Sequence, residues 1–137
     1  MNAIVLDCSV AMAWCFEDEC DDYAEAVLGA LASTEALVPS IWPFEVANVV
    51  LVAERCKRLR EAEGARFIEL LSALPIIVEE AAPERTFGAV LACGRQFGLS
   101  SYDAAYLELA MRAGAELATR DKALRAACRK SGVTVYS

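Results

Sequence analysis

The chain has 137 residues, of which 57% are hydrophobic and 24% charged, with a net charge of −7, six cysteines and no histidine. This length fits one domain, and the apolar content excludes a disordered chain. Without histidine there can be no Ser-His-Asp triad, Cys-His pair or histidine-based ribonuclease chemistry, so any hydrolysis has to rely on carboxylates and metal. No G-x-x-x-x-G-K-[ST] or G-x-G-x-x-G motif supports a glycine loop around a nucleotide.

The apolar segments predict a protein that is neither exported nor inserted in a membrane. The first apolar run has no basic residues before it and ends at Asp7, unlike a signal peptide. The stretch over residues 36–53 contains Pro39, Pro43 and Glu45, which argues against a membrane span. We expect a cytoplasmic protein with reduced cysteines, because the cysteines form no C-x-x-C pair and match no common zinc spacing.

Short apolar segments alternate with longer segments of helical period, which predicts an α/β fold with a parallel sheet, in a single domain over residues 1–137. The expected strands are Ala3–Leu6, Ala36–Val38, Ile76–Glu79, Glu116–Ala118 and Val133–Tyr136. The expected helices are Val10–Phe16, Asp21–Leu31, Pro43–Arg55, Arg60–Leu74, Pro83–Phe97, Tyr102–Ala113 and Lys122–Lys130. Gly98, Gly114 and Gly132 stand where C-terminal caps belong, and Pro43 suits a first helical turn.

Four acidic residues interrupt apolar patterns, and the first of them is Asp7. It follows the strand Ala3–Leu6 directly, so it lies at the carboxyl end of that strand, where open α/β sheets bind ligands. The alternative role is a helix N-cap, for which Ser9 is also available. The position therefore favours a functional carboxylate.

Glu45 lies in a predicted helix that is apolar nearly all round. Its neighbours at i+4 and i+7 are Val49 and Val52. A glutamate in such surroundings needs a partner or a metal ion, and Asn48, one turn on, is placed to orient it. The alternative is a first-turn glutamate that only interacts with the helix dipole.

Asp103 and Asp121 are weaker signals taken one at a time. The segment from Ser100 to Asp103 fits a capping box. However, the helix face that carries Asp103 continues through Tyr106, which favours a carboxylate directed toward the core. Asp121 suits a cap for the helix that begins at Lys122, and it also follows a predicted strand. Two strand ends and two helix starts would bring all four acids to one edge of the sheet.

The repulsion among four carboxylates at one sheet edge argues for a bound cation. Two unit charges about 4 Å apart repel by about 4 kcal/mol at an effective dielectric constant of 20. Oxygen ligands without histidine or paired thiolates favour Mg²⁺ or Mn²⁺ over zinc. Such a site can activate water and stabilise an in-line displacement at phosphorus.

The segments around these acids resemble the acidic motifs of PIN-domain ribonucleases, and the whole chain is similar to the VapC toxins of toxin-antitoxin systems. The segments are Ile4-Val5-Leu6-Asp7-Cys8-Ser9, Pro43-Phe44-Glu45-Val46-Ala47-Asn48, Ser101-Tyr102-Asp103-Ala104-Ala105-Tyr106 and Leu117-Ala118-Thr119-Arg120-Asp121-Lys122-Ala123-Leu124. The resemblance implies a PIN-like three-layer sandwich, with a short five-stranded parallel sheet doubly wound by about seven helices.

The resemblance also implies a metal-dependent endoribonuclease that uses Mg²⁺ or Mn²⁺, forms a homodimer and is inhibited by a small antitoxin protein. The metal-binding catalytic acids would be Asp7, Glu45, Asp103 and Asp121, supported by the hydroxyls of Ser9 and Thr119. Arg120 is open to two readings, a phosphate contact or a solvated loop charge.

The acidic net charge is an objection, because nucleic-acid enzymes usually carry a basic footprint. The four acids supply four of the seven net negative charges, which two divalent ions would neutralise. Basic clusters remain at residues 55–60 and 120–130. The first is open to contact with RNA or with an acidic partner, the second to contact with the RNA backbone, and a solvated face is the alternative for both.

Other classes of protein also place acids at a sheet edge. A receiver-like domain is disfavoured by the lack of an acidic pair after the first strand, and a haloacid-dehalogenase-like phosphatase by Ser9, where a second aspartate belongs. A housekeeping RNA-processing PIN nuclease and a catalytically silent PIN-like binding module stay open as alternatives, although retention of all four acids argues against the silent module. A neighbouring antitoxin-like reading frame would favour the toxin.

Overall fold

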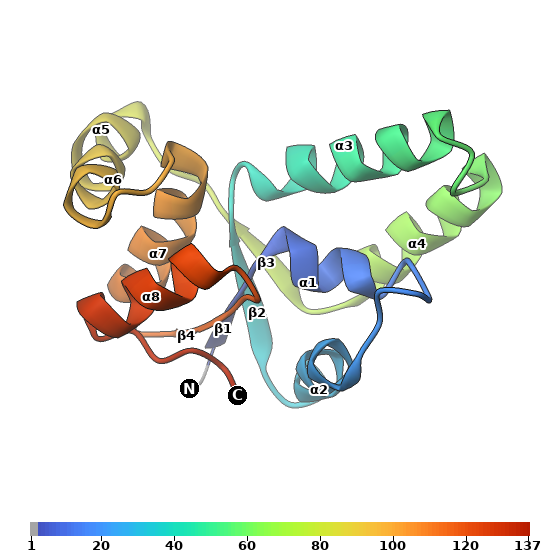
Figure 1. Ribbon diagram of the computed structural model, residues 1–137, viewed down its shortest axis with the longest axis horizontal. Coiled ribbons are helices and arrows are strands. Elements are labelled where there is room, and N and C mark those ends of the chain that lie inside the picture. Colours follow the sequence, from blue (N-terminus) through green and yellow to red (C-terminus); the bar gives the residue numbers. More distant parts are fainter. Residues whose placement is uncertain (1–2) are drawn as a thin grey trace.

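A computed structural model describes residues 3–137 as an α/β fold around a four-stranded parallel sheet (Figure 1). The strands are β1 (Ala3–Leu6), β2 (Glu35–Pro39), β3 (Ile76–Glu79) and β4 (Glu116–Ala118), in the order β3-β2-β1-β4. Each adjacent pair is parallel, with Ile4 of β1 opposite Ala36 of β2 on one side and Glu116 of β4 on the other. The predicted α/β class with a parallel sheet is confirmed.

The predicted fifth strand, Val133–Tyr136, is wrong. The segment forms an isolated parallel bridge between Leu117 and Val135. The N–H of Leu117 donates to the Thr134 carbonyl and the N–H of Tyr136 donates to the Leu117 carbonyl, both at 3.0 Å. Both hydrogen bonds involve the same residue, Leu117 of the three-residue strand β4. The segment therefore forms a single bridge and no ladder.

The helices follow the predicted segments closely. They are α1 (Cys8–Ala13), α2 (Asp22–Ala30), α3 (Trp42–Arg55), α4 (Glu61–Ala73), α5 (Pro83–Arg85), α6 (Leu91–Phe97), α7 (Ser101–Ala113) and α8 (Lys122–Ser131). A π-helical turn, η1 (Thr86–Val90), joins α5 to α6 in one continuous segment where the sequence predicts a single helix. Gly98, Gly114 and Gly132 have φ angles of 65°, 63° and 81°, the left-handed C-terminal caps that were predicted.

The order of the strands places the helices on both faces of the sheet. The chain runs from β1 through β2 to β3 in one direction and then returns to β4 on the other side of β1. Since parallel crossovers are right-handed, the connections before and after β3 cover opposite faces. Helix α7 packs against β1, β2 and β4, while α1 packs against α2 and α3 (Figure 1). The direction in which successive strands are added to the sheet reverses between β1 and β4. Open α/β folds bind their ligands at this position.

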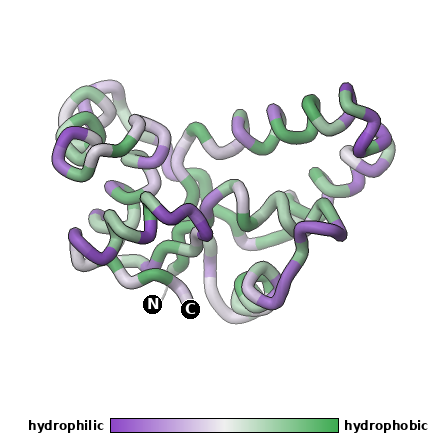
Figure 2. Tube along the Cα trace, viewed as in Figure 1, coloured by the Kyte–Doolittle hydropathy of each residue, from purple (hydrophilic) through white to green (hydrophobic). Residues whose placement is uncertain are grey.

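The core lies between the sheet and these helices. Val5 and Leu6 of β1 and Leu107 of α7 are fully buried. Figure 2 shows hydrophobic residues along the central strands and hydrophilic residues at the turn between α3 and α4. All six cysteines are free thiols. No helix within residues 3–137 is long and apolar enough to cross a membrane.

Candidate functional site

Asp7 lies between β1 and α1, with its carboxylate held by two hydroxyls. Asp7 is the N-cap residue of α1, but its side chain makes no capping hydrogen bond. Instead, the hydroxyls of Ser9 and Thr119 donate to Oδ2 at 3.1 and 2.7 Å. The predicted supporting hydroxyls thus both contact Asp7. The N-cap alternative holds for the position of Asp7 but not for its side chain, and Ser9 lies inside α1. Oδ1 has no hydrogen bond within residues 3–137.

Thr119 also connects Asp7 to the fourth acid. Its side chain is fully buried, and its hydroxyl oxygen accepts from the N–H of Asp121 at 3.1 Å. Asp121 Oδ2 in turn accepts from the N–H of Leu124 at 2.8 Å, so this aspartate does cap α8 as the alternative predicted. The cap uses one carboxylate oxygen and leaves the other exposed at the same sheet edge.

Glu45 lies in the first turn of α3 and has a buried partner. The hydroxyl of Tyr106 donates to Glu45 Oε1 at 2.5 Å and accepts from the N–H of Cys8 at 3.3 Å. The sequence predicted a partner for Glu45 but proposed Asn48, which makes no hydrogen bond to it in the part of the chain that the structure describes. The observed hydrogen-bond partner is Tyr106, which the sequence pattern placed only on the apolar face of its helix.

Asp103 lies in the first turn of α7 with its carboxylate free of hydrogen bonds to residues 3–137. The hydroxyl of Ser100 accepts from the backbone N–H of Asp103 at 3.2 Å, which is one half of the capping box. The other half, from the carboxylate back to Ser100, does not form. The half-buried carboxylate therefore keeps both oxygens available to a ligand.

The acids at this edge interact electrostatically. Burial raises the pKa of Glu45, the Tyr106 hydroxyl opposes that rise, and the charges of Asp7 and Asp103 raise the pKa further. Burial also raises the pKa of Asp103, followed by the charges of Asp121 and Asp7. Within residues 3–137 none of these four acids forms an ion pair, although seven ion pairs join other acids to arginines. The edge therefore carries uncompensated negative charge.

The donor set at this edge fits a hard divalent cation. Asp7 Oδ1, Glu45 Oε2 and both oxygens of Asp103 have no hydrogen bond to the described residues, and carboxylate oxygens are the ligands that Mg²⁺ and Mn²⁺ prefer. As they stand, no three Cys, Asp or Glu side chains within residues 3–137 lie close enough together to hold one ion. Mg²⁺ commonly keeps several waters and binds to only one or two carboxylates, so a group of three is not required.

A hollow of about 440 Å³ extends from the acids between α1 and α3. Asp7, Glu45 and Asn48 line it, and Arg58 lies on its wall. The guanidinium of Arg58 lies 4.0 Å from the centre of the Phe16 ring and pairs with Asp18 and Glu19, in each case at 2.8 Å. The predicted basic cluster at residues 55–60 thus contributes one arginine to the hollow, with its charge already paired.

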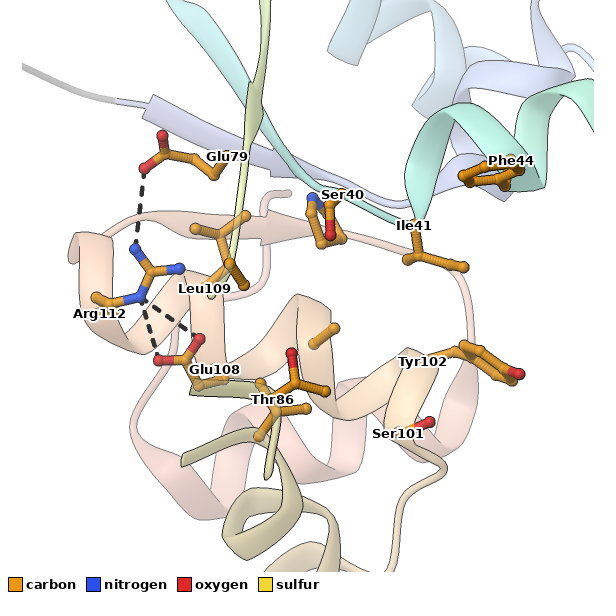
Figure 3. Close-up of a pocket in the computed structure, with 14 residues that line it drawn as sticks. Ser40, Ile41, Phe44, Glu79, Thr86, Ser101, Tyr102, Glu108, Leu109 and Arg112 are labelled. Atoms are coloured by element: carbon orange, nitrogen blue, oxygen red, sulfur yellow. Dashed lines mark hydrogen bonds and ion pairs between the residues drawn. The ribbon is translucent and has the colours of Figure 1, made fainter. Parts of the chain in front are cut away.

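A second, apolar hollow of about 360 Å³ lies on the other side of α3 (Figure 3). Phe44 and Tyr102 line it and are 75% and 59% exposed. Figure 3 shows the ion pairs of Arg112 with Glu108 and Glu79 along its wall. A smaller hollow, lined by Phe44, Tyr102 and Glu45, lies between the apolar and the acidic hollows, so exposed apolar surface adjoins the acids.

The second basic cluster supports the loop after β4. Arg120 pairs with Asp21, the N-cap residue of α2, through Nη2 and Oδ1 at 2.5 Å. Arg125 Nε donates to the Thr119 carbonyl at 2.6 Å. Arg120 is thus a partly exposed loop charge that is paired with an acid of the same chain, and its contact with phosphate stays a prediction.

The fold agrees with the comparisons to known proteins. The sequence matches the PIN domain over residues 4–130, and the chain belongs to the PIN domain family. None of the curated proteins matches it significantly.

Three solved structures share the fold at low sequence identity. PAE2754 from Pyrobaculum aerophilum is 20% identical, with 92% of this chain and 84% of that chain covered and a TM-score of 0.71. VapBC2 from Rickettsia felis, bound to a DNA fragment from its promoter, is 14% identical, with 98% and 97% covered and a TM-score of 0.68. A toxin-antitoxin complex from Klebsiella pneumoniae is 18% identical, with 88% and 87% covered and a TM-score of 0.63.

Proposed function

We propose that this chain is a Mg²⁺- or Mn²⁺-dependent endoribonuclease and the toxin component of a toxin-antitoxin pair. Membership of the PIN domain family supports this, because PIN domains are generally nucleases. The observation that carries the proposal is the set of acids Asp7, Glu45 and Asp103, which interact at the carboxyl edge of a parallel sheet without any cationic partner in residues 3–137.

Asp7, Glu45 and Asp103 would hold the divalent cation, with Asp121 adding charge beside them. When bound, such an ion supplies a water of lowered pKa and stabilises the charge that develops on a phosphodiester. Ser9 and Thr119 fix Asp7 through Oδ2, which leaves Oδ1 for the ion. Asp121 uses one oxygen to cap α8, so we expect it to contribute less than Asp7 and Asp103.

The substrate would approach along the hollow between α1 and α3. A phosphodiester backbone lying there would meet the acids at one end and Arg58 at the other. The preference for RNA over DNA rests on the resemblance to VapC toxins, as does a cytoplasmic site of action. The acidic net charge of the chain is compatible with this role, because the four acids at the sheet edge account for four of its seven net negative charges.

The proposed partners are a second copy of this chain and a small antitoxin. Large exposed apolar side chains support both, because extended apolar surface marks interaction sites. They include Phe44, Leu51 and Val52 of α3 together with Phe87 and Tyr102. We expect sedimentation of the isolated chain at tens of micromolar to show a dimer, and a strictly monomeric species would contradict that part of the proposal.

The decisive experiment measures cleavage of end-labelled RNA by the purified chain with Mg²⁺ or Mn²⁺ and after chelation. Asp103→Asn should abolish cleavage, whereas Glu69→Gln, which removes one exposed charge from α4, should leave it unchanged. Absence of metal-dependent cleavage across a panel of structured and single-stranded RNAs would overturn the enzyme assignment, as would an Asp103→Asn variant with wild-type activity.

A growth experiment separates a toxin from a housekeeping nuclease. Expression of the wild-type chain should arrest growth, and co-expression of the neighbouring reading frame should restore it. Expression of Asp103→Asn should cause no arrest. Growth unaffected by an active nuclease would favour the housekeeping role.

A further inference from the structure

Tyr106 joins three segments of the chain beneath the acids. Its side chain is 1% exposed, yet its hydroxyl makes two hydrogen bonds. It accepts from the N–H of Cys8 at the start of α1 at 3.3 Å and donates to Glu45 Oε1 on α3 at 2.5 Å. One phenol on α7 thus links the residue after Asp7 to Glu45.

The directions of these two bonds are fixed by the groups involved. The backbone N–H of Cys8 can only donate, and it is one of the N–H groups that a helix start leaves without an intrahelical partner. The single hydrogen of the phenol is therefore free to go to Glu45, whose ionised carboxylate can only accept. A hydrogen bond to an ionised acceptor is shorter and stronger than one between neutral groups, which agrees with the 2.5 Å distance.

This bond opposes a force that would turn Glu45 away from the site. Glu45 has a flexible side chain that borders a solvent-filled hollow, and the like charges of Asp7 and Asp103 lie near it. Repulsion alone favours a rotamer that points the carboxylate into solvent, away from both aspartates. The bond to Tyr106 holds Oε1 inside and leaves Oε2 for a ligand. Asp103 lies one turn before Tyr106 on α7, so the same helix presents both groups to the site.

We propose that Tyr106 is a positioning residue that holds Glu45 beside Asp7 and Asp103, so that the site binds its divalent cation at full affinity. This inference rests on the proposed metal-dependent nuclease function. Tyr106 does not touch the cation or the RNA and acts through Glu45. Partners of metal ligands commonly change metal affinity or activity 10- to 100-fold, and we expect an effect of about that size.

The test compares Mn²⁺ affinity, measured from the EPR signal of free Mn²⁺, for folded wild type and Tyr106→Phe. Tyr106→Phe keeps the ring and removes the hydroxyl, and it should weaken Mn²⁺ binding about 10- to 100-fold. RNA cleavage at fixed Mn²⁺ should fall with it and recover at higher Mn²⁺. Tyr136→Phe is the matched control, because it removes a phenol that lines neither of the two hollows beside Glu45 and should leave Mn²⁺ affinity unchanged.

A double-mutant cycle shows whether Tyr106 acts through Glu45. Glu45→Gln should weaken Mn²⁺ binding, and adding Tyr106→Phe should weaken it no further. 4-Aminophenylalanine at position 106, which keeps the ring and an N–H donor, should restore affinity close to wild type and also serves if Tyr106→Phe folds poorly.

Three results would overturn the inference: wild-type Mn²⁺ affinity in Tyr106→Phe, an additive loss in the Glu45→Gln background, or no rescue by the amine. A different result would overturn the proposed metal site itself, and the inference with it. That result is a wild-type chain that binds no Mn²⁺, or an Asp7→Asn variant that binds it as tightly as wild type.

Discussion

Two acids of α7 lie five residues apart in opposite electrostatic surroundings. Glu108 is 7% exposed and accepts hydrogen bonds from Arg85 at 3.1 Å and Arg112 at 3.2 Å. Arg112 also lies 3.9 Å from Glu79, which continues the network (Figure 3). Within residues 3–137 the carboxylate of Asp103 has neither an ion pair nor a hydrogen bond, and burial, followed by the neighbouring acids, raises its pKa.

The partners of an acid, more than its burial, distinguish Glu108, which is structural, from Asp103, which we propose to be a metal ligand. The charge of Glu108 is compensated by two arginines of the same chain, so it makes no demand on a ligand. The charge of Asp103 is shared only with other acids, so it requires a proton, separation from the other acids or a cation. Variants at both positions test whether this difference in partners sets the roles of the two acids.

The largest expected effect is the loss of RNA cleavage in Asp7→Asn and in Asp103→Asn. Each should reduce kcat on the order of 10³-fold, because each removes a charge from the proposed metal site. Glu45→Gln and Asp121→Asn should also reduce cleavage severely, but less. Circular dichroism should show that all four variants fold. Near wild-type cleavage by the purified variants, with contaminating nuclease excluded, would remove the distinction between the two acids of α7.

Glu108→Gln should have the opposite profile, with a loss of stability and retention of cleavage. The variant leaves two arginines facing a neutral amide, and we expect a loss of about 2 kcal/mol in the free energy of unfolding, since both arginines keep partial access to water. Urea denaturation measures the stability, and cleavage per folded molecule measures the activity. A stable variant that no longer cleaves RNA would show that Glu108 serves the site.

The sequence was sufficient to predict the parts of the fold and site that depend on local pattern. Asp7 directly follows an apolar strand, and a strand end in a parallel sheet has one possible location. The roles of Ser9 and Thr119 as supporting hydroxyls came from the resemblance to a family, and the structure places both hydroxyls on Asp7. The parallel sheet and the left-handed caps likewise follow from apolar runs and glycines.

The features that the sequence missed depend on partners far along the chain. Glu108 interrupts an apolar helix just as Glu45 does, and only the position of Arg85, 23 residues away, marks it as structural. Tyr106 and Glu45 are 61 residues apart, so no local spacing pairs them. One signal was present, because a buried tyrosine hydroxyl needs a partner and Glu45 lacked one. The short length of β4, which keeps the last segment from forming a fifth strand, is also not evident from the local sequence.

A smaller expected effect is stabilisation of the fold by Mn²⁺. A ligand that binds only the folded state stabilises it by about 2.7 kcal/mol at a hundredfold excess over Kd, and Mg²⁺ should give a smaller shift at equal concentration. Differential scanning fluorimetry across a metal titration measures the change in Tm. The Asp7→Asn/Asp103→Asn double variant is the control, and it should respond less. Equal shifts in both proteins would place the cation elsewhere.

The smallest expected effect is a change in the free energy of unfolding of the metal-free chain with pH. Neutralising Glu45 and neutralising Glu63 should change this free energy in opposite directions. Burial and the neighbouring acids raise the pKa of Glu45 above its ordinary value of 4.5. The folded state therefore holds this proton more tightly than the unfolded state, and the associated stability is present below pH 4.5 and lost as pH rises through the folded pKa. At neutral pH, Glu45→Gln, which keeps an oxygen to accept from Tyr106, should stabilise the metal-free chain.

Glu63 supplies the opposite case on the far helix α4. The backbone N–H of Arg60 donates to its Oε1 at 2.9 Å and, with the Arg60 side chain, holds the pKa of Glu63 below its usual range. Its contribution to stability is present above pH 4.5 and lost as pH falls through the folded pKa, so Glu63→Gln should destabilise the chain at neutral pH. Melting curves from pH 4 to 8 in chelator should show the two variants on opposite sides of wild type at pH 7, converging toward it at pH 4. If Glu45→Gln instead destabilises the metal-free chain at pH 7, the acids at the sheet edge are compensated without a cation, and the contrast between Asp103 and Glu108 loses its physical basis.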